Sequence, residues 1–291
     1  MHLSLLFNPT NSLAVSTVGE LYDYAEKLGL SLHMSEQNFA KISNGLKKPH
    51  IHLHKTDHEV LLHGEITVAI GGDGTILRAA DLVRSVKHPL LGVNSGRLGY
   101  LTNTQRNNLE SALHDIMEGN YDLDKRFFIE AEFSNGDIFY ALNEFVFSRG
   151  RTVSMITLTA EYDGAFINRY WADGVIVSSP TGSTAYNLST GGPIVLPRTN
   201  VIVLTPINPH TLTTRPLVLP SCKNLTIKVE PIDQEVLFSG DGNNYELLED
   251  SPVVDIRQSP QYIQLITLSG QSYFETLRSK LMWGADVRDK R

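Results

Sequence analysis

The sequence predicts two domains: an α/β domain with a parallel sheet, followed by a domain rich in β-strands. The first observation is that short apolar runs alternate with helical apolar patterns up to about residue 122, as repeated β-α-β units require. The second is that later runs are short and β-rich, with Gly, Pro, Asn and Asp between them. The length of 291 residues accommodates two domains of ordinary size.

The elements of the first domain follow in order along the chain. Apolar runs predict strands over 3–7, 30–34, 66–70 and 89–93. Helical spacing predicts helices over 15–28, 76–86 and 107–118, and Gly29 and Gly119 follow the first and last of these. The run 66–70 is typical of a strand buried on both faces. Right-handed crossovers between such strands give a parallel, Rossmann-like sheet.

The second domain is predicted from its short strands. They are expected over 128–133, 139–147, 155–162, 175–178, 201–205, 225–229, 236–238, 253–256 and 263–268. A helix is expected over 272–282. We therefore place the α/β domain at residues 1–122 and a β-rich, β-sandwich-like domain at 123–271. The C-terminal segment 272–291 is expected to pack back onto the first domain.

Composition and charge exclude several classes of protein. The net charge is −7, and no long basic run is present, which argues against a nucleic-acid binder. No stretch approaches the roughly 20 apolar residues of a membrane helix, and Asn8-Pro9 ends the N-terminal apolar run after seven residues. Cys222 is the only cysteine, so no intrachain disulfide is possible. We expect a cytoplasmic protein.

The sharpest motif is Gly71-Gly72-Asp73-Gly74-Thr75, which lies between a predicted buried strand and a helix. Ligands of open α/β sheets bind outside the carboxyl ends of the strands, and glycine-rich turns before helices present N–H groups to anions. The spacing fits neither the dinucleotide fingerprint nor the lysine-bearing P-loop. A carboxylate among phosphate-binding amides suits a proton acceptor or a Mg²⁺ ligand. The alternative is a tight turn in which Asp73 caps the helix.

Two further features join polar residues to apolar strands. The segment Asp173–Tyr186 runs from a buried strand into a turn rich in Ser, Thr and Gly, whose hydroxyl and N–H groups suit ribose, phosphate or amide groups. The alternative is a Ser/Thr-capped helix. Asn143-Glu144 interrupts an apolar run. Neighbours on a regular strand point to opposite faces, so both side chains reach one ligand only at a strand end or bulge. The alternative is a sheet with one solvent-exposed edge.

With these motifs, the chain resembles the NAD kinase family. The resemblance rests on 71–75, on 94–101, on Asn143-Glu144, on 173–192 and on Arg215-Pro216-Leu217. It implies an N-terminal nucleotide-binding domain and the reaction ATP + NAD → ADP + NADP with a divalent cation, for which we expect Mg²⁺. It also implies a homo-oligomer, either a tetramer or a dimer. Inorganic polyphosphate remains open as an alternative phosphoryl donor.

The resemblance also implies roles for single residues. Asp73 would be the general base for the 2′-hydroxyl of the adenosine ribose. Phosphate would be held by the amides around this residue, and Arg78 would assist. Asp173 would contact NAD, in one arrangement from a neighbouring subunit. The expected binding residues are Gly72, Gly74, Thr75, Arg78, Asn143, Glu144, Asp173, Thr184, Ala185, Tyr186, Ser189 and Asn243.

Two positions depart from the family pattern. Trp171 replaces a basic residue, which leaves the choice between NAD and NADH open, and Asn243 replaces a more usual glutamine. His50, His52 and His54 alternate, so they would share one face of a strand, but no carboxylate or cysteine joins them and we assign no metal there. The rival functions are a lipid or sphingoid kinase, which shares the Gly-Gly-Asp-Gly turn, and a non-catalytic NAD sensor.

Overall fold

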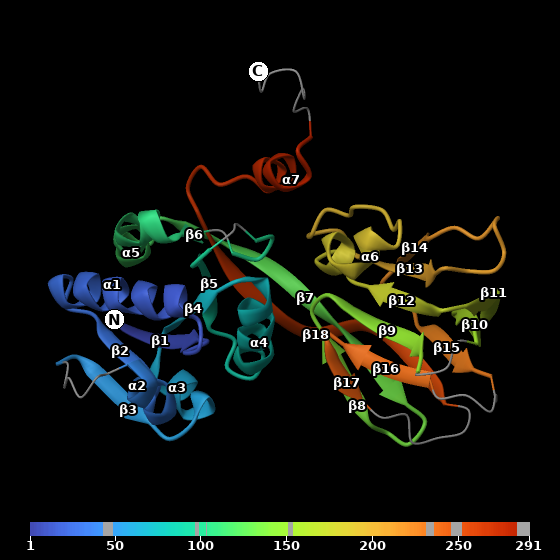
Figure 1. The fold of residues 1–291 in the computed structure, drawn as a ribbon, viewed down its shortest axis with the longest axis horizontal. Coiled ribbons are helices and arrows are strands. Elements are labelled where there is room, and N and C mark those ends of the chain that lie inside the picture. Colours follow the sequence, from blue (N-terminus) through green and yellow to red (C-terminus); the bar gives the residue numbers. More distant parts are fainter. Residues whose placement is uncertain are drawn as a thin grey trace. The chain divides into compact units, whose positions relative to one another are not determined.

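The computed structural model describes residues 1–42, 49–96, 99–102, 104–150, 154–230, 236–245 and 252–283. The chain forms two compact units, drawn in Figure 1. Unit 1 comprises Met1–Lys125 and Ile263–Arg291, and unit 2 comprises Arg126–Tyr262. Strands β7 (Tyr121–Phe133) and β18 (Val253–Leu268) each begin in one unit and end in the other. The unit borders, at 125/126 and 262/263, therefore lie inside strands, whereas the sequence places them near residues 122 and 271.

Unit 1 is built on a parallel sheet, as the sequence predicts. The strand order is β3 (Ile51–His54), β2 (Ser31–Ser35), β1 (His2–Phe7), β4 (Ile66–Gly71) and β5 (Pro89–Asn94), and all neighbours pair in parallel. The end of β18 joins β5, as does the short β6 (Thr104–Gln105). The chain reverses its direction of growth between β1 and β4, which is the switch point where open α/β sheets bind ligands.

Helices cover both faces of this sheet. Helices α1 (Ser12–Lys27) and α5 (Leu109–Glu118) pack on the face that carries Leu3, Leu5 and Phe7. Helix α3 (Asp57–His63) lies on the other face, where the Ser4 hydroxyl donates to the Val60 carbonyl at 2.8 Å. The remaining helices of unit 1 are α2 (Glu36–Ile42), α4 (Asp73–Val83), η1 (Arg106–Asn108) and α7 (Tyr273–Leu281). The glycine-rich turn lies at the N-terminus of α4.

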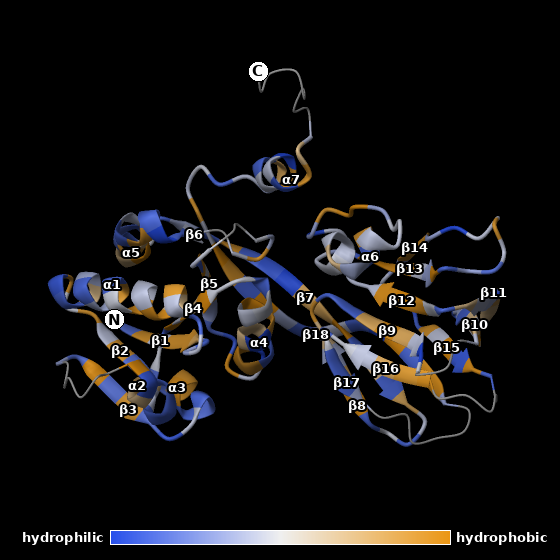
Figure 2. Ribbon diagram, in the orientation of Figure 1, coloured by the Kyte–Doolittle hydropathy of each residue, from blue (hydrophilic) through white to orange (hydrophobic). Residues whose placement is uncertain are grey.

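Unit 2 contains two antiparallel layers with an apolar core between them. One layer has the order β14 (Leu217–Pro220), β13 (Val201–Ile207), β12 (Gly174–Ser178), β9 (Glu144–Arg149), β16 (Val236–Gly240) and β17 (Asn243–Tyr245). The other contains β11 (Ala165–Ala172), β10 (Ile156–Tyr162), β15 (Leu225–Val229), β18, β7 and β8 (Ile138–Ala141). Figure 2 shows the hydrophobic stretches along β9, β12 and β18 that supply this core. The predicted β-rich second domain is confirmed.

Several predicted elements have different bounds. The expected strand over 139–147 is broken into β8 and β9, with Leu142 and Asn143 between them. The expected strands over 253–256 and 263–268 are one strand, β18. Helix α4 begins at Asp73, three residues before its predicted start, because Gly72 is its N-cap. Among the residues described, none of the helices combines the length and apolar character needed to cross a membrane.

Candidate active site

The glycine-rich turn of unit 1 joins a buried strand to a helix start. Every residue of β4 is buried, and α4 begins at Asp73 directly after it. Gly71 has no room for a side chain, because an added Cβ would lie 2.3 Å from the Thr75 hydroxyl oxygen. The first N–H groups of a helix lack intrahelical partners and carry the positive end of its dipole. The turn therefore suits an anion.

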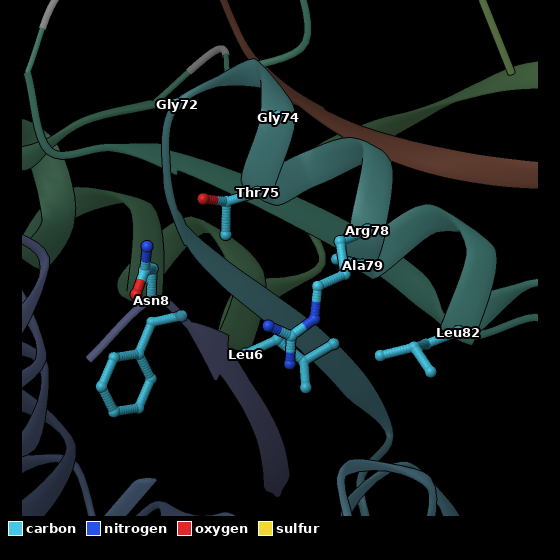
Figure 3. Close-up of a pocket in the computed structure, with 9 residues that line it drawn as sticks. Leu6, Asn8, Gly72, Gly74, Thr75, Arg78, Ala79 and Leu82 are labelled. Carbon is cyan, nitrogen blue, oxygen red and sulfur yellow. The ribbon is translucent and has the colours of Figure 1, made fainter. Parts of the chain in front are cut away.

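A cavity of about 430 Å³ opens beside this turn. Its walls come from the carboxyl end of β1, from Gly72 directly after β4 and from one side of α4, so it lies at the switch point of the sheet. Figure 3 shows Arg78 reaching from α4 towards Leu6. The lining residues are Leu6, Phe7, Asn8, Gly72, Gly74, Thr75, Arg78, Ala79 and Leu82. Four of the residues expected to bind phosphate therefore share one cavity.

Arg78 is held in place by an acidic partner. Its Nη2 lies 2.5 Å from Asp57 Oδ2 at the start of α3, while 62% of the Arg78 side chain is exposed. Thr56 is the N-cap of α3, and its hydroxyl accepts from the Glu59 N–H at 3.1 Å. A guanidinium has five N–H donors, so the ion pair leaves others free to bind phosphate. The expected role of Arg78 is compatible with this pairing.

Asp73 does not cap its helix. Its Oδ2 accepts from the Tyr100 N–H at 2.8 Å and its Oδ1 from the Leu101 N–H at 3.0 Å. A Cβ at Gly99 would lie 1.9 Å from Oδ1, so only glycine permits this approach. The Tyr100 ring in turn faces the Lys280 ammonium of α7 at 5.5 Å. The carboxylate is thus fixed by backbone donors, and Asp73 is not among the residues that line the cavity. Gly72 is the N-cap of α4, so the helix-cap alternative is wrong.

In unit 2, Asn143 and Glu144 lie at a strand end. Asn143 lies in the break between β8 and β9, and Glu144 is the first residue of β9. A strand end is one of the two places where the sequence argument allows adjacent side chains to reach one ligand. The Asn143 carbonyl accepts from the Ser179 N–H at 2.8 Å. A Cβ at Gly182 would lie 2.2 Å from that carbonyl oxygen. Two polar segments that are far apart in sequence are therefore in direct contact.

Glu144 is the most perturbed acid described in unit 2. Only 8% of the residue is exposed, and its Oε2 is buried without a hydrogen-bond partner among the described residues. Burial, followed by the nearby charge of Asp241, raises the pKa of Glu144 to about 8, while the Tyr186 backbone N–H acts in the opposite direction. A buried polar atom without a partner is rare in proteins and marks a place where a ligand can supply one.

The turn after β12 contacts Glu144 through the backbone N–H of Tyr186, from which the carboxylate accepts. Thr184 and Ala185 are half-buried, whereas Tyr186 and Ser189 are exposed. The residues form η2 (Gly182–Thr184) and α6 (Tyr186–Ser189). Asn187, which sequence analysis missed, is fully buried and donates to the carbonyls of Ser183 and Pro193 at 3.1 and 3.2 Å. No sequence signal distinguished it from its polar neighbours.

Asp173 lies at the opposite end of the same strand. It precedes Gly174, the first residue of β12, whereas the Ser/Thr turn follows the last. Five strand residues separate the two ends by about 17 Å. Asp173 Oδ1 pairs with Arg149 Nε at 2.8 Å, and Oδ2 accepts from Asn208 Nδ2 at 3.0 Å. Within one chain, the structure does not bring Asp173 together with Asn143 and Glu144.

The two departures from the family pattern are both at the surface. Trp171 is exposed on β11 and packs on His210, with ring centroids 4.3 Å apart. Asn243 is exposed at the start of β17, two residues after Asp241. Asp241, which sequence analysis did not single out, accepts from three backbone N–H groups between Leu142 and Glu144.

The alternating histidines belong to a larger group. His2, His33, His52, His54 and His63 form a histidine cluster on the face of the sheet that α3 covers. His50 is outside it, because it precedes β3 with a φ of 64°. Within the described residues, no three or more His, Cys, Asp or Glu side chains are arranged to hold a metal ion.

Comparison with known proteins identifies relatives along most of the chain. The sequence model of the ATP-NAD kinase N-terminal domain matches residues 3–121, and that of the ATP-NAD kinase C-terminal domain matches residues 142–268. The NAD kinase of Cytophaga hutchinsonii is 40% identical over 228 residues, covering 77% of this chain and 78% of that protein. The NAD kinase of Christiangramia forsetii is 36% identical over 284 residues, covering 95% and 96%.

Two solved structures share the fold. Yeast NADH kinase, crystallised with NADH, superposes with a TM-score of 0.91 at 24% identity, covering 100% of this chain and 90% of that one. An NAD kinase from Archaeoglobus fulgidus, crystallised with ATP, has a TM-score of 0.74 at 24% identity, covering 97% and 99%. At this identity the likeness establishes the arrangement of strands and helices.

Proposed function

The chain belongs to the ATP-NAD kinase family, and on this premise we propose that it phosphorylates the 2′-hydroxyl of the adenosine ribose of NAD with ATP, giving NADP and ADP. The enzyme is then a phosphotransferase that uses an alcohol as acceptor. The observation that carries the proposal is the cavity at the switch point of the parallel sheet, with Gly72, Gly74, Thr75 and Arg78 in its wall. Asp73 lies within the same turn.

Phosphate binding would rest on backbone groups and one cation. The free N–H groups at the start of α4 would donate to phosphate oxygens, and the Arg78 guanidinium would add a charge-assisted hydrogen bond. Binding through backbone N–H groups and a single arginine suits a chain whose net charge is −7 and whose overall charge therefore does not attract nucleotides. Asp57 would keep the guanidinium over the cavity.

Asp73 would accept the proton of the attacking hydroxyl. A carboxylate offers about four lone-pair positions, and the Tyr100 and Leu101 N–H groups use two of them. Phosphoryl transfer through a loose transition state depends mainly on positioning and charge stabilisation, so the placement of the base matters most. The backbone contacts supply that placement.

We propose that a divalent cation, Mg²⁺ by preference, accompanies ATP. The described residues have no ready-made set of three or more His, Cys, Asp or Glu ligands. Mg²⁺ commonly binds through substrate phosphates, water and one or two carboxylates, so the residues present fit an ion that arrives with its nucleotide. The ion would neutralise charge on the phosphates. Asp73 is the acidic side chain of the turn that could face it.

The dinucleotide would be held by unit 2. Asn143 and Glu144 at the start of β9 would bind its polar groups, with the turn over Thr184, Ala185, Tyr186 and Ser189 beside them. The exposed Tyr186 ring offers a face for stacking on a base. Asn243 would line the edge of this site. Asp173, at the far end of β12, would serve the site of a neighbouring subunit.

We propose that the protein is a cytoplasmic homo-oligomer, either a tetramer or a dimer. In such an oligomer, Asp173 would contact NAD bound in the site of a neighbouring subunit. Exposed apolar side chains on strands of unit 2, including Phe166, Leu217 and Val218, offer surface for such an association. A single cysteine suits a reducing compartment. Light scattering on the purified protein would determine the number of subunits.

The decisive experiment detects the product directly. Purified protein is incubated with Mg-ATP and NAD, and NADP is measured by mass, with NADH and diacylglycerol as parallel acceptors and polyphosphate as a second donor. We expect NADP from ATP and NAD. Phosphorylation of diacylglycerol alone would indicate a lipid kinase. Tight NAD binding without a product from any donor would indicate a sensor and end the kinase assignment.

A further inference from the structure

Asp241 joins two segments that are about one hundred residues apart in sequence. It follows β16 in a turn where Asp241 and Gly242 have φ angles of 49° and 81°. Its Oδ2 accepts from the Leu142 N–H at 2.6 Å, and its Oδ1 accepts from the Asn143 and Glu144 N–H groups at 2.8 and 3.2 Å. The Asp241 N–H donates back to the Glu144 carbonyl at 3.1 Å. Four hydrogen bonds therefore connect the turn to the strand break.

These bonds satisfy the backbone where the sheet ladder is interrupted. Strand β8 ends at Ala141 and β9 begins at Glu144, so the intervening N–H groups need another acceptor. One carboxylate supplies it, much as an aspartate caps the start of a helix. The backbone direction at Asn143 and Glu144 decides where their side chains point. That direction depends on the turn after β16.

We propose that Asp241 is a positioning residue for NAD binding: its carboxylate sets the backbone of Leu142, Asn143 and Glu144 and so directs the Asn143 and Glu144 side chains to the dinucleotide. The inference rests on the proposed function, in which those two side chains contact NAD. Asp241 itself need not touch the substrate. Its role is separate from that of Asn243, the residue directly after this turn that was predicted from the sequence to bind ligand.

The charge of Asp241 has a second effect on the site. Two carboxyl groups that share a buried site are not readily ionised together. The three backbone donors stabilise the anion of Asp241, so Glu144 is the partner that retains a proton. This agrees with the Glu144 pKa of about 8, which burial and then Asp241 raise. Below that pH, Glu144 can donate an O–H to an acceptor on the ligand, and above it the donor is lost.

The test substitutes Asp241→Asn and measures steady-state kinetics. An amide keeps the shape of the side chain, but its NH₂ would oppose one of the backbone N–H donors. We expect the KM for NAD to rise about tenfold or more, with the KM for ATP within about twofold of wild type. The matched control is Asp163→Asn, because Asp163 and Gly164 form a turn with nearly the same φ angles, 50° and 78°, on the β10–β11 hairpin. The control should behave as wild type.

A pH profile separates positioning from a general loss of structure. In the wild type, NAD affinity should fall as the pH rises through about 8, because the Glu144 proton is lost. The midpoint should move to lower pH in Asp241→Asn, where the neighbouring negative charge is absent, and the transition should vanish in Glu144→Gln. A melting curve checks that each variant folds. If Asp241→Asn does not fold, Asp241→Ser, whose hydroxyl can still accept from a backbone N–H, replaces it under the same criteria.

The outcomes are distinct. An unchanged KM for NAD together with an unchanged pH midpoint in Asp241→Asn overturns the inference, and so does a transition that persists in Glu144→Gln. A wild-type protein that binds NAD but forms no NADP would contradict the proposed function alone. In that case calorimetric NAD affinities of the same variants still decide whether Asp241 positions the site.

Discussion

At the scale of the residue, Asp73 shows how backbone groups can anchor a carboxylate. Two backbone donors hold it, and a missing side chain at Gly99 makes the approach possible. The sequence indicated the residue because an acid among glycines is unusual in a phosphate loop. It did not indicate the anchor, because Tyr100 and Leu101 act through their backbone N–H groups, which every residue except proline shares.

We predict that Asp73→Asn lowers kcat by about 10²–10⁴, because an amide cannot take the proton of the attacking hydroxyl. NAD should still bind, as calorimetry can measure. The control is Asp81→Asn on the same helix, since Asp81 is exposed and pairs only with Arg84 among the interactions described for it. Near wild-type turnover in Asp73→Asn would rule out a role as base.

The second residue-scale prediction concerns ATP. Replacing Arg78 with alanine should raise the KM for ATP about tenfold, because one charge-assisted hydrogen bond to phosphate is lost, and leave the KM for NAD nearly unchanged. Arg84→Ala is the matched control, because Arg84 follows the same helix but is not among the residues that line the cavity. Equal KM values for ATP in the two variants would exclude Arg78 from phosphate binding.

At the scale of the element, local patterns predicted long helices and apolar strands and failed where elements are short. Helices α2 and α3 have seven residues each, and β3 has four. Such lengths hold at most two helical turns, so their apolar spacing is no clear signal. Strand β3 also carries histidines where an apolar strand would be expected. Its place is decided by parallel pairing with β2, which is a tertiary contact.

The histidine cluster predicts a loss of stability in mild acid. Burial, followed by the nearby His52, His54, His2 and His63, lowers the pKa of His33 to about 4 from an ordinary value near 6.5. The folded protein therefore keeps His33 neutral while the unfolded chain takes up a proton. The free energy of unfolding should fall as the pH drops from about 6.5 to 4, by on the order of 1–3 kcal/mol.

Denaturant unfolding at several pH values checks this. His33→Gln should unfold with a weaker dependence on pH than the wild type, whereas His114→Gln, at an exposed position on α5, should keep the full dependence. One acid opposes the effect: burial and then His63 lower the pKa of His54, whereas Glu59 acts to raise it. Identical pH dependence in the wild type and His33→Gln would show that the cluster does not set acid stability.

At the scale of the whole molecule, the sequence predicted two domains of different class. It also singled out the glycine-rich turn of unit 1 and the Asn143-Glu144 pair of unit 2, because each motif follows a recognisable strand. Contacts between distant segments were beyond it. Asp241 acts on residues 97 to 99 positions earlier, and no local pattern marks such a pairing. Strand β18 is likewise one continuous strand that runs through both units. The local sequence pattern predicted two separate strands there.

The proposed binding of ATP by unit 1 and of NAD by unit 2 predicts ligand-specific stabilisation. A ligand present at 100 times its Kd stabilises the folded state by about 2.7 kcal/mol, which a melting curve detects. Arg78→Ala should reduce the shift caused by ATP at a fixed concentration but keep the shift caused by NAD. Glu144→Gln should show the reverse. If each substitution weakened both shifts equally, the assignment of ATP to unit 1 and NAD to unit 2 would be wrong.

Position 99 offers a way to measure how strictly the placement of Asp73 limits the choice of amino acid at a neighbouring position. The methyl group of an alanine there would lie 1.9 Å from Asp73 Oδ1. That oxygen would have to move away from the backbone N–H that it accepts from. A randomised library at this codon, selected for NADP synthesis, should therefore return glycine alone. Recovery of alanine or serine would mean that the acid tolerates being displaced.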